Sequence, residues 1–209
     1  MSYLIGERET ELYQRLRNEA PEISFKRIGR AMRMAFENNG WHKHRSGIPL
    51  ILHLLEVAHI LLRYTKEEDI IVAGLLHDII ARNANVCPNV LIVCFGTRVG
   101  KMVDGITPLY WGTTRSLVLT KDETLRKVRL QEDWGCLLIK LAEHVHDVST
   151  IGKLMSAKAY KNFIKEMEGF VLPLAQELGL KLELQQLNTL QRLVKASHDL
   201  IAHSEAGTL

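Results

Sequence analysis

Apolar residues recur at three- and four-residue spacing through nearly the whole chain, and only five prolines interrupt this pattern. Such spacing is typical of helices that bury one face. The helices it predicts fall at about 7–18, 22–38, 50–64, 66–82, 88–95, 97–105, 121–131, 134–150, 156–178 and 181–204. We therefore expect an all-α fold, formed as one domain over residues 1–209, in which roughly eight to ten helices pack as a bundle.

Capping residues locate the start of the fourth predicted helix. Thr65 is a favourable N-cap, and Glu68 stands at the position that completes a capping box. The helix is therefore predicted to run from about Lys66 to Arg82. The polar pair His77-Asp78 would then lie near the C-terminal end of a continuous helix.

Composition narrows the classes of protein to which the chain can belong. Apolar residues make up 46% and charged residues 24%, and the net charge is only +3. This charge is too small and too dispersed to predict binding to DNA, RNA or a membrane surface. No apolar run reaches the roughly 18 residues of a spanning helix, and the first residues lack the pattern of a signal peptide. The three cysteines show no CxxC spacing, so we expect reduced thiols in a cytoplasmic protein.

The His77-Asp78 pair closes the apolar run that begins at Ile70. Burying a carboxylate without compensation costs several kcal/mol or more. A cation bound jointly by the imidazole and the carboxylate would supply that compensation. The alternative is an aspartate that hydrogen-bonds locally at a helix end, beside a half-buried histidine. Further candidate ligands for a cation are His53 and either Glu143 or Asp147.

A succession of motifs extends over roughly residues 25–185 in colinear order. The motifs are Ser46-Gly47-Ile48-Pro49-Leu50-Ile51-Leu52-His53, Leu75-Leu76-His77-Asp78, Phe95-Gly96, Val103-Asp104-Gly105-Ile106-Thr107, Leu125-Arg126-Lys127, Lys140-Leu141-Ala142-Glu143 and Pro173-Leu174-Ala175. This succession resembles the HD superfamily of metal-dependent phosphohydrolases. More narrowly, it is similar to the hydrolase domain of the RelA/SpoT alarmone enzymes and of their stand-alone small relatives. The resemblance implies an HD-type helical bundle.

The resemblance also implies a metal site. It makes His53, His77 and Asp78 ligands of a divalent cation, usually Mn²⁺ in this family. The family's fourth ligand is an aspartate, and its position is taken here by Glu143. Glutamate keeps the carboxylate but adds a methylene, so it would ligate after a shift or through water.

The implied partner is a small nucleotide such as (p)ppGpp, from which the family releases pyrophosphate at the 3′ position. Assembly into an oligomer is left open. The residues expected to contact the nucleotide are His44, Arg45, Ser46, Asp147 and Thr150.

The chain departs from the family directly after the His-Asp pair. Active members read H-D-x-x-E-D, and the two acids orient and deprotonate the attacking water. Ala81 and Arg82 occupy these positions here, so no catalytic carboxylate is retained there. General acid–base catalysis typically contributes about 10²–10⁴ in rate. Arg82 cannot be the base, although an arginine binds phosphate well.

Three functions therefore remain open from the sequence. The first is a phosphohydrolase of the (p)ppGpp type with weak or altered activity. The second is a catalytically inactive sensor that binds a nucleotide or a partner. The third is a hydrolase of another phosphate ester whose base comes from elsewhere, with Glu123 or Asp147 as candidates.

Overall fold

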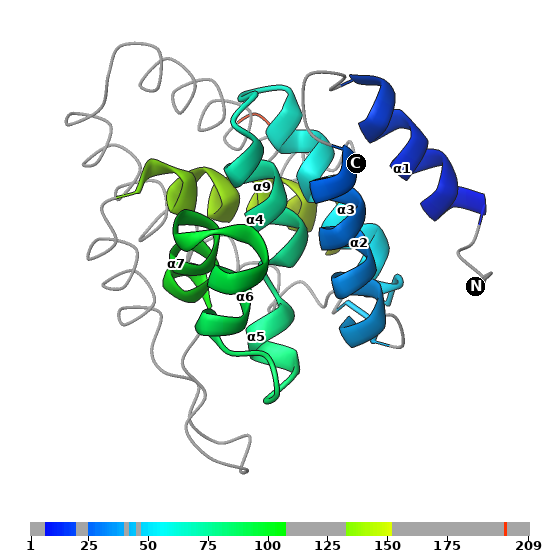
Figure 1. The fold of residues 1–209 in the computed structure, drawn as a ribbon. Helices are drawn as coiled ribbons and strands as arrows, with labels where there is room; N and C mark the ends of the chain where they lie inside the picture. Colours follow the sequence, from blue (N-terminus) through cyan, green and yellow to red (C-terminus); the bar gives the residue numbers. More distant parts are fainter. Residues whose placement is uncertain are drawn as a thin grey trace, which may run out of the picture. The chain divides into compact units, whose positions relative to one another are not determined.

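The computed structural model describes residues 7–19, 25–39, 42–44, 47–107, 133–151 and 199. Over these residues the chain is all-α, as predicted, and its only pairing of the β type is an isolated bridge between Lys43 and Pro49. The helices are α1 (Glu7–Glu19), α2 (Phe25–Asn39), α3 (Leu50–Leu62), α4 (Glu68–Leu76), α5 (Ile79–Arg82), α6 (Pro88–Phe95), α7 (Thr97–Ile106) and α9 (Trp134–Ile151) (Figure 1). Apart from Asp199, which is helical, the helices predicted at 121–131, 156–178 and 181–204 lie outside the described residues.

The chain divides into two compact units, residues 1–103 and residues 104–209, and the boundary falls within α7. The single domain predicted from the sequence stays a prediction. Within the described ranges, no helix combines the length and the apolar character needed to cross a bilayer.

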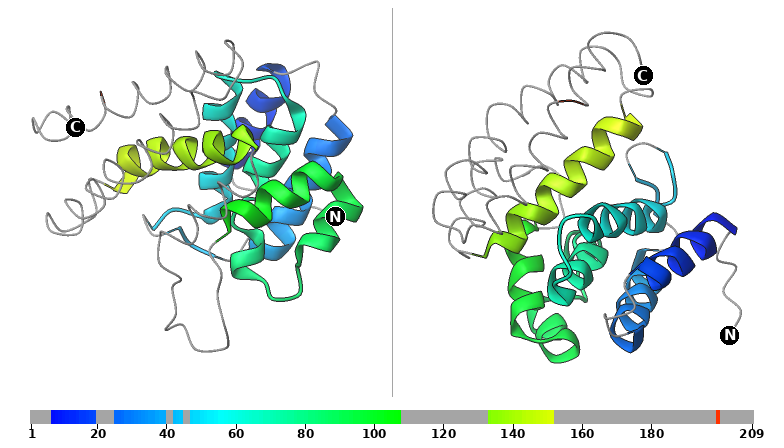
Figure 2. Two further views of the ribbon diagram at one scale, coloured as in Figure 1. Left: turned by 90° about the vertical axis from the view of Figure 1, so that its left-hand side faces the viewer. Right: turned by 90° about the horizontal axis from the view of Figure 1, so that it is seen from above.

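The centre of the first unit is the pair α3 and α4. In α3 every residue except Glu56 and Ile60 is buried, and Ile70–Leu76 of α4 is buried without exception. A helix that is apolar on all sides is stable in water only when other helices cover it. α3 packs against α1, α2 and α4, while α2 also packs against α4 and α5 (Figure 2). These neighbours hold the two central helices in a fixed relation.

Gly74 allows α3 and α4 to approach closely. A Cβ atom at this position would overlap the side chain of Leu61 on α3. Any other residue would therefore push the helices apart or distort Leu61. This contact lies one turn before His77, so it also determines where the end of α4 stands relative to α3.

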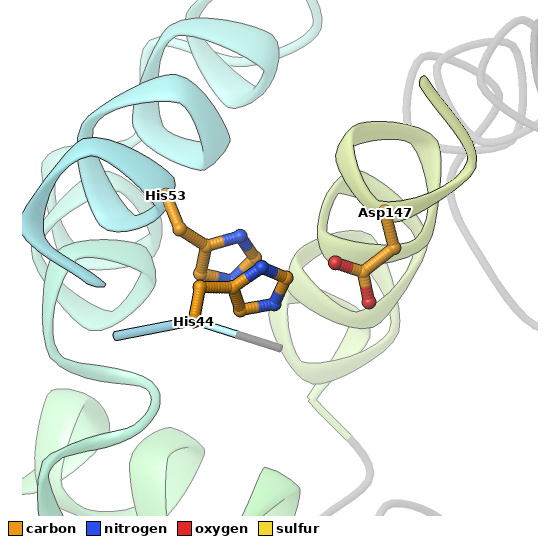
Figure 3. A group of neighbouring side chains, drawn as sticks. All are labelled: His44, His53 and Asp147. Atoms are coloured by element: carbon orange, nitrogen blue, oxygen red, sulfur yellow. The ribbon is translucent and has the colours of Figure 1, made fainter. Parts of the chain in front are cut away.

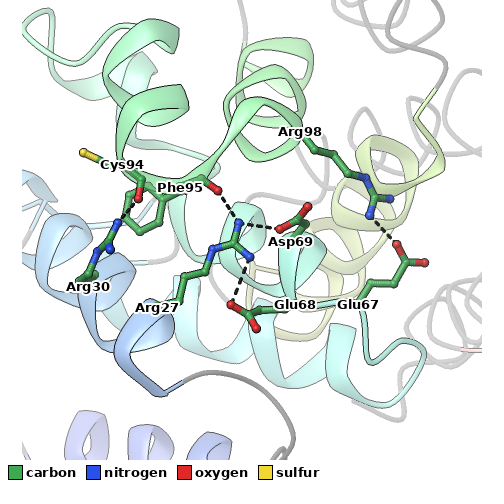
Figure 4. A network of polar contacts seen from close by, with 8 residues as sticks. All are labelled: Arg27, Arg30, Glu67, Glu68, Asp69, Cys94, Phe95 and Arg98. Atoms are coloured by element: carbon green, nitrogen blue, oxygen red, sulfur yellow. Dashed lines mark hydrogen bonds and ion pairs between the residues drawn. The ribbon is translucent and has the colours of Figure 1, made fainter.

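Arginine side chains connect α2 to the start of α4 and the end of α6 (Figure 4). Arg27 contacts the carboxylates of Glu68 and Asp69 at 3.1 and 2.6 Å and donates to the carbonyl oxygen of Phe95. Arg30 donates to the carbonyl oxygen of Cys94. The last carbonyls of a helix have no partner within the helix, so these guanidinium groups complete the C-terminal end of α6.

The structure corrects the fourth predicted helix. α4 ends at Leu76, His77 and Asp78 form a turn, and the short helix α5 begins at Ile79. Asp78 has φ −97° and ψ −5°, a conformation found in turns rather than within helices. The capping box is also wrong: Glu67 occupies the N-cap position, and the Thr65 hydroxyl oxygen accepts the N–H of Glu67 at 3.0 Å. A threonine that binds the backbone two residues on favours a turn at the expense of the cap.

The described part of the second unit is mainly α9. Its N-terminus is capped by Asp133, whose Oδ1 accepts the N–H of Gly135 at 2.9 Å. Leu137, Leu138, Leu141 and Ala142 form a buried stripe at helical spacing, whereas Val145 on the following turn is half-buried. α9 therefore has one apolar side that is buried.

Candidate metal centre

Two histidines from different helices of the first unit face each other. His53 lies in the first turn of α3, and His77 is the residue at which α4 ends. Their Nε2 atoms are 3.2 Å apart, and the two residues are only 1% and 3% exposed. The packing of α3 against α4 positions both backbones and so determines the separation of the two Nε2 atoms.

The backbone of α4 orients the His77 ring. Nδ1 of His77 lies 2.7 Å from the carbonyl oxygen of Gly74, and a carbonyl oxygen can only accept a hydrogen bond. Nδ1 therefore carries the proton, and a neutral His77 presents an unprotonated Nε2 toward His53. This is the arrangement of metal-binding histidines, whose second nitrogen donates to a carbonyl or carboxylate.

Asp78 adds a carboxylate next to the two imidazoles. Its Oδ1 lies 4.0 Å from Nε2 of His77. Its Oδ2 accepts from Arg82, whose Nε and Nη2 are each 3.0 Å away. The carboxylate that sequence comparison assigns to a cation is thus held by a guanidinium group from the following turn.

The donor set is compatible with a divalent cation. Two ligands at about 2.1 Å from one ion, at an angle of about 90–110°, stand about 3.0–3.4 Å apart. The separation of 3.2 Å between the two Nε2 atoms falls in this range. Imidazole nitrogen and carboxylate oxygen together suit first-row divalent cations. The same separation also suits a hydrogen bond in which His53 donates to His77.

His44 packs on His53. The two imidazole rings are stacked with centroids 4.1 Å apart and planes inclined by 6° (Figure 3). A tight turn carries His44: its N–H donates to Ile48 O at 2.9 Å, and Gly47, with φ +84°, donates to His44 O at 2.8 Å. His44 is buried in this arrangement, and its ring lies against a candidate ligand. Its expected contact with the nucleotide stays a prediction.

The residues on either side of His44 are only partly described. His42 and Lys43 are exposed, and Arg45 and Ser46 lie outside the described residues.

The candidate residues of the second unit all lie on α9. Glu143 accepts a hydrogen bond from Lys140 Nζ at 2.6 Å, and its side chain is 16% exposed. Thr150 donates its hydroxyl to the carbonyl oxygen of His146 at 2.9 Å. Asp147 is fully buried. Like His44 and His53 of the first unit, Asp147 is a buried residue of a type that binds divalent cations.

Sequence reasoning missed two contacts of the site. The Asp78–Arg82 pair could have been predicted from the sequence, because an acid and a base four residues apart share one side of a helical turn. The stacking of His44 on His53 could not, since it depends on how the loop before α3 turns back. The first of these contacts involves Arg82, a position at which this chain differs from its family's pattern.

Comparison with known proteins identifies the family to which this chain belongs. The HD-domain family profile matches residues 31–181, and the chain belongs to the HD-domain family. Within that family it is homologous to the RelA/SpoT-type (p)ppGpp hydrolase domain, as its motifs predicted.

Two relatives illustrate the homology, and one solved structure shares the fold. The chain is 32% identical over 176 residues to the GTP pyrophosphokinase rsh of Brucella ovis, covering 83% of this chain and 23% of that protein. It is 30% identical over 181 residues to the bifunctional (p)ppGpp synthase/hydrolase SpoT of Escherichia coli, covering 84% and 26%. The chain therefore spans about a quarter of these relatives' length. A metazoan ortholog of SpoT, described as hydrolysing ppGpp, has the same fold, with a TM-score of 0.58 and 16% identity over 88% of this chain and 97% of the other.

Proposed function

We propose that this chain binds a divalent cation and a guanosine nucleotide of the (p)ppGpp type, and that it hydrolyses the nucleotide weakly or with altered specificity. The observation that carries this proposal is the pair of buried Nε2 atoms of His53 and His77, 3.2 Å apart. The Gly74 carbonyl supports it, because it leaves Nε2 of His77 available as a ligand. Homology to proteins that act on these nucleotides supplies the substrate class.

The proposed roles follow the family's motifs. His53, His77 and Asp78 hold the cation, which we take to be Mn²⁺, and Glu143 is its fourth ligand. When bound, such an ion polarises a phosphoryl oxygen and lowers the pKa of a bound water. The residues proposed to contact the nucleotide are His44, Arg45, Ser46, Asp147 and Thr150.

The residues after the His-Asp pair limit the proposed reaction. A water that attacks phosphorus must lose a proton, and Ala81 has no group that can accept it. Arg82 is permanently charged and already bonded to Asp78. We therefore expect hydrolysis to be slower by about 10²–10⁴ than with the acidic pair in place.

One contact favours a second candidate function. The Arg82 guanidinium occupies Oδ2 of Asp78, and a domain with a neutralised ligand and no base is suited to binding without turnover. In this alternative the chain is a catalytically inactive sensor of the same nucleotide or of a partner protein.

The two candidates differ in an experiment with purified protein, Mn²⁺ and ppGpp. The hydrolase proposal predicts slow formation of pyrophosphate and GDP, which the His77→Ala variant lacks. Tight ppGpp binding with no product at high protein concentration would establish the sensor instead. If ppGpp neither binds nor reacts, the nucleotide proposal is wrong.

A further inference from the structure

Arg82 brings a positive charge to a residue of the candidate metal centre. It is the last residue of α5, and both its Nε and Nη2 lie 3.0 Å from Oδ2 of Asp78. The side chains of Arg82 and Asp78 are 31% and 20% exposed. The pair is therefore partly shielded from water, and solvent screens its attraction less than that of a fully exposed pair.

The local geometry favours this pair. An acid followed four residues later by a base is an attractive arrangement on one side of a helical turn. Here the turn at His77-Asp78 and the single turn of α5 keep the two side chains on the same side. Nε and Nη2 of Arg82 both contact Oδ2 of Asp78, while Oδ1 lies 4.0 Å from Nε2 of His77.

We infer that Arg82 is a resident counter-ion of Asp78 that opposes an entering divalent cation, so that the arginine weakens cation binding at this centre. The inference rests on the proposed function, because it takes Asp78 as a ligand. A cation bonded to the Asp78 carboxylate would stand within a few ångströms of the guanidinium, and like charges at that distance repel. Binding must therefore either break the Arg82–Asp78 pair or tolerate this repulsion.

The chain's departure from its family then has a second consequence, for cation binding. The acidic pair of the H-D-x-x-E-D pattern carries two negative charges, which attract a cation. Ala81 and Arg82 replace them with one positive charge. The same substitutions that remove the base therefore also lower the attraction of the centre for its cation.

The test is a measurement of cation affinity, which does not depend on activity. Mn²⁺ binding to the full chain would be followed by titration calorimetry in the wild type and in the Arg82→Gln and Arg98→Gln variants. Arg98 is a matched control: it forms an ion pair of 2.6 Å with Glu67, and its side chain is 37% exposed. We expect Arg82→Gln to bind Mn²⁺ about three- to tenfold more tightly, because the competing pair is gone. Arg98→Gln removes the same charge and should stay within about twofold of the wild type.

A second measurement uses the unmodified protein. Addition of Mg²⁺, which is diamagnetic, should shift the ¹⁵Nε–H resonance of Arg82 as the pair with Asp78 breaks. The resonance of Arg98 should not move.

Each outcome has a definite meaning. Equal Mn²⁺ affinity of wild type and Arg82→Gln, or an unmoved Arg82 resonance at saturating Mg²⁺, would overturn the counter-ion role while leaving the metal site intact. Failure of every variant to bind Mn²⁺ or Mg²⁺ would overturn the metal site of the proposed function, and the inference with it. Arg82→Lys keeps the charge but loses the planar guanidinium, so its affinity should lie between those of wild type and Arg82→Gln.

Discussion

Leu61 of α3 occupies the space into which a Cβ atom at Gly74 of α4 would project. The carbonyl oxygen of the same glycine accepts the Nδ1–H of His77. One residue therefore both closes the packing of the two central helices and orients a candidate ligand. Stability and ligand geometry are linked at this point of the core.

The Gly74→Ala variant should unfold more easily than the wild type. The added methyl group overlaps Leu61, and overpacking a core typically costs about 1–3 kcal/mol. Urea denaturation measures the difference in the free energy of unfolding. Gly29→Ala is the control, since a Cβ there meets only the Tyr13 hydroxyl at 3.2 Å, and it should stay within about 1 kcal/mol of the wild type. Equal stability of both variants would mean that α3 and α4 separate without cost.

His77→Ala should abolish stoichiometric Mn²⁺ binding. Loss of second-shell partners of a metal site costs about 10–100-fold in affinity, and loss of a ligand itself should exceed this. Metal content after gel filtration measures the effect. His42→Ala is the control, because His42 is exposed and should retain the metal. Full metal content in His77→Ala would place the cation elsewhere.

Restoring the acidic pair should raise ppGpp hydrolysis. The double variant Ala81→Glu, Arg82→Asp supplies a proton acceptor and removes the guanidinium from Asp78. Release of pyrophosphate should then rise by about 10²–10⁴. If the variant binds Mn²⁺ but gains no activity, the limiting defect lies at another departure from the family, and Glu143 is the position to change next.

Arg27→Leu should destabilise the first unit. The guanidinium group bonds to Glu68, Asp69 and the Phe95 carbonyl, and its loss leaves two partly buried carboxylates and a helix-end carbonyl without this partner. Such a loss typically costs about 1–3 kcal/mol. Thermal or urea unfolding measures it, and Arg33→Leu on the exposed side of α2 should cost far less. Similar losses for the two variants would argue that the network contributes little.

The contact between α1 and α3 should weaken in acid. The hydrogen bond from Arg15 lowers the pKa of Glu19, which also lies 3.6 Å from Nδ1 of His59. A lowered pKa in the folded state means that the stabilisation is present above the ordinary value, near 4.5, and is lost as the pH falls through the lowered one.

Glu19→Gln should therefore be less stable than the wild type at pH 7 and nearly equal to it in strong acid. Because the Glu19 side chain is 39% exposed, the difference should be below about 1 kcal/mol. Urea midpoints at several pH values measure it. A difference that does not change with pH would assign the effect to packing.

The sequence was sufficient for the helices that depend on local periodicity. α6 begins and ends as predicted at Pro88 and Phe95, because proline and glycine mark its limits. The break after Leu76 was not predictable in the same way. Nothing in the residues around His77-Asp78 disfavours a helix strongly, so the break follows from packing that a local pattern does not contain.

The residues of the candidate site differ in the same way in how far they could be predicted. His53 and His77 were chosen from motifs, and the structure brings their Nε2 atoms together. The stacking of the His44 ring on His53 was not predictable from the motifs, because it depends on the turn at Gly47 that folds the loop inward. Side chains on helices follow from spacing, whereas side chains on loops follow from a backbone path that only the structure reveals.

The short helix α5 buries a single side chain, Ile79, and presents Ala81 and Arg82 at its outer end. Substitutions at such positions change folding stability little. Selection for a well-folded domain therefore does not protect the two positions on which the proposed reaction depends. Under that proposal, turnover can be lost, and regained, on a scaffold that stays the same, so membership of this fold by itself says little about catalysis.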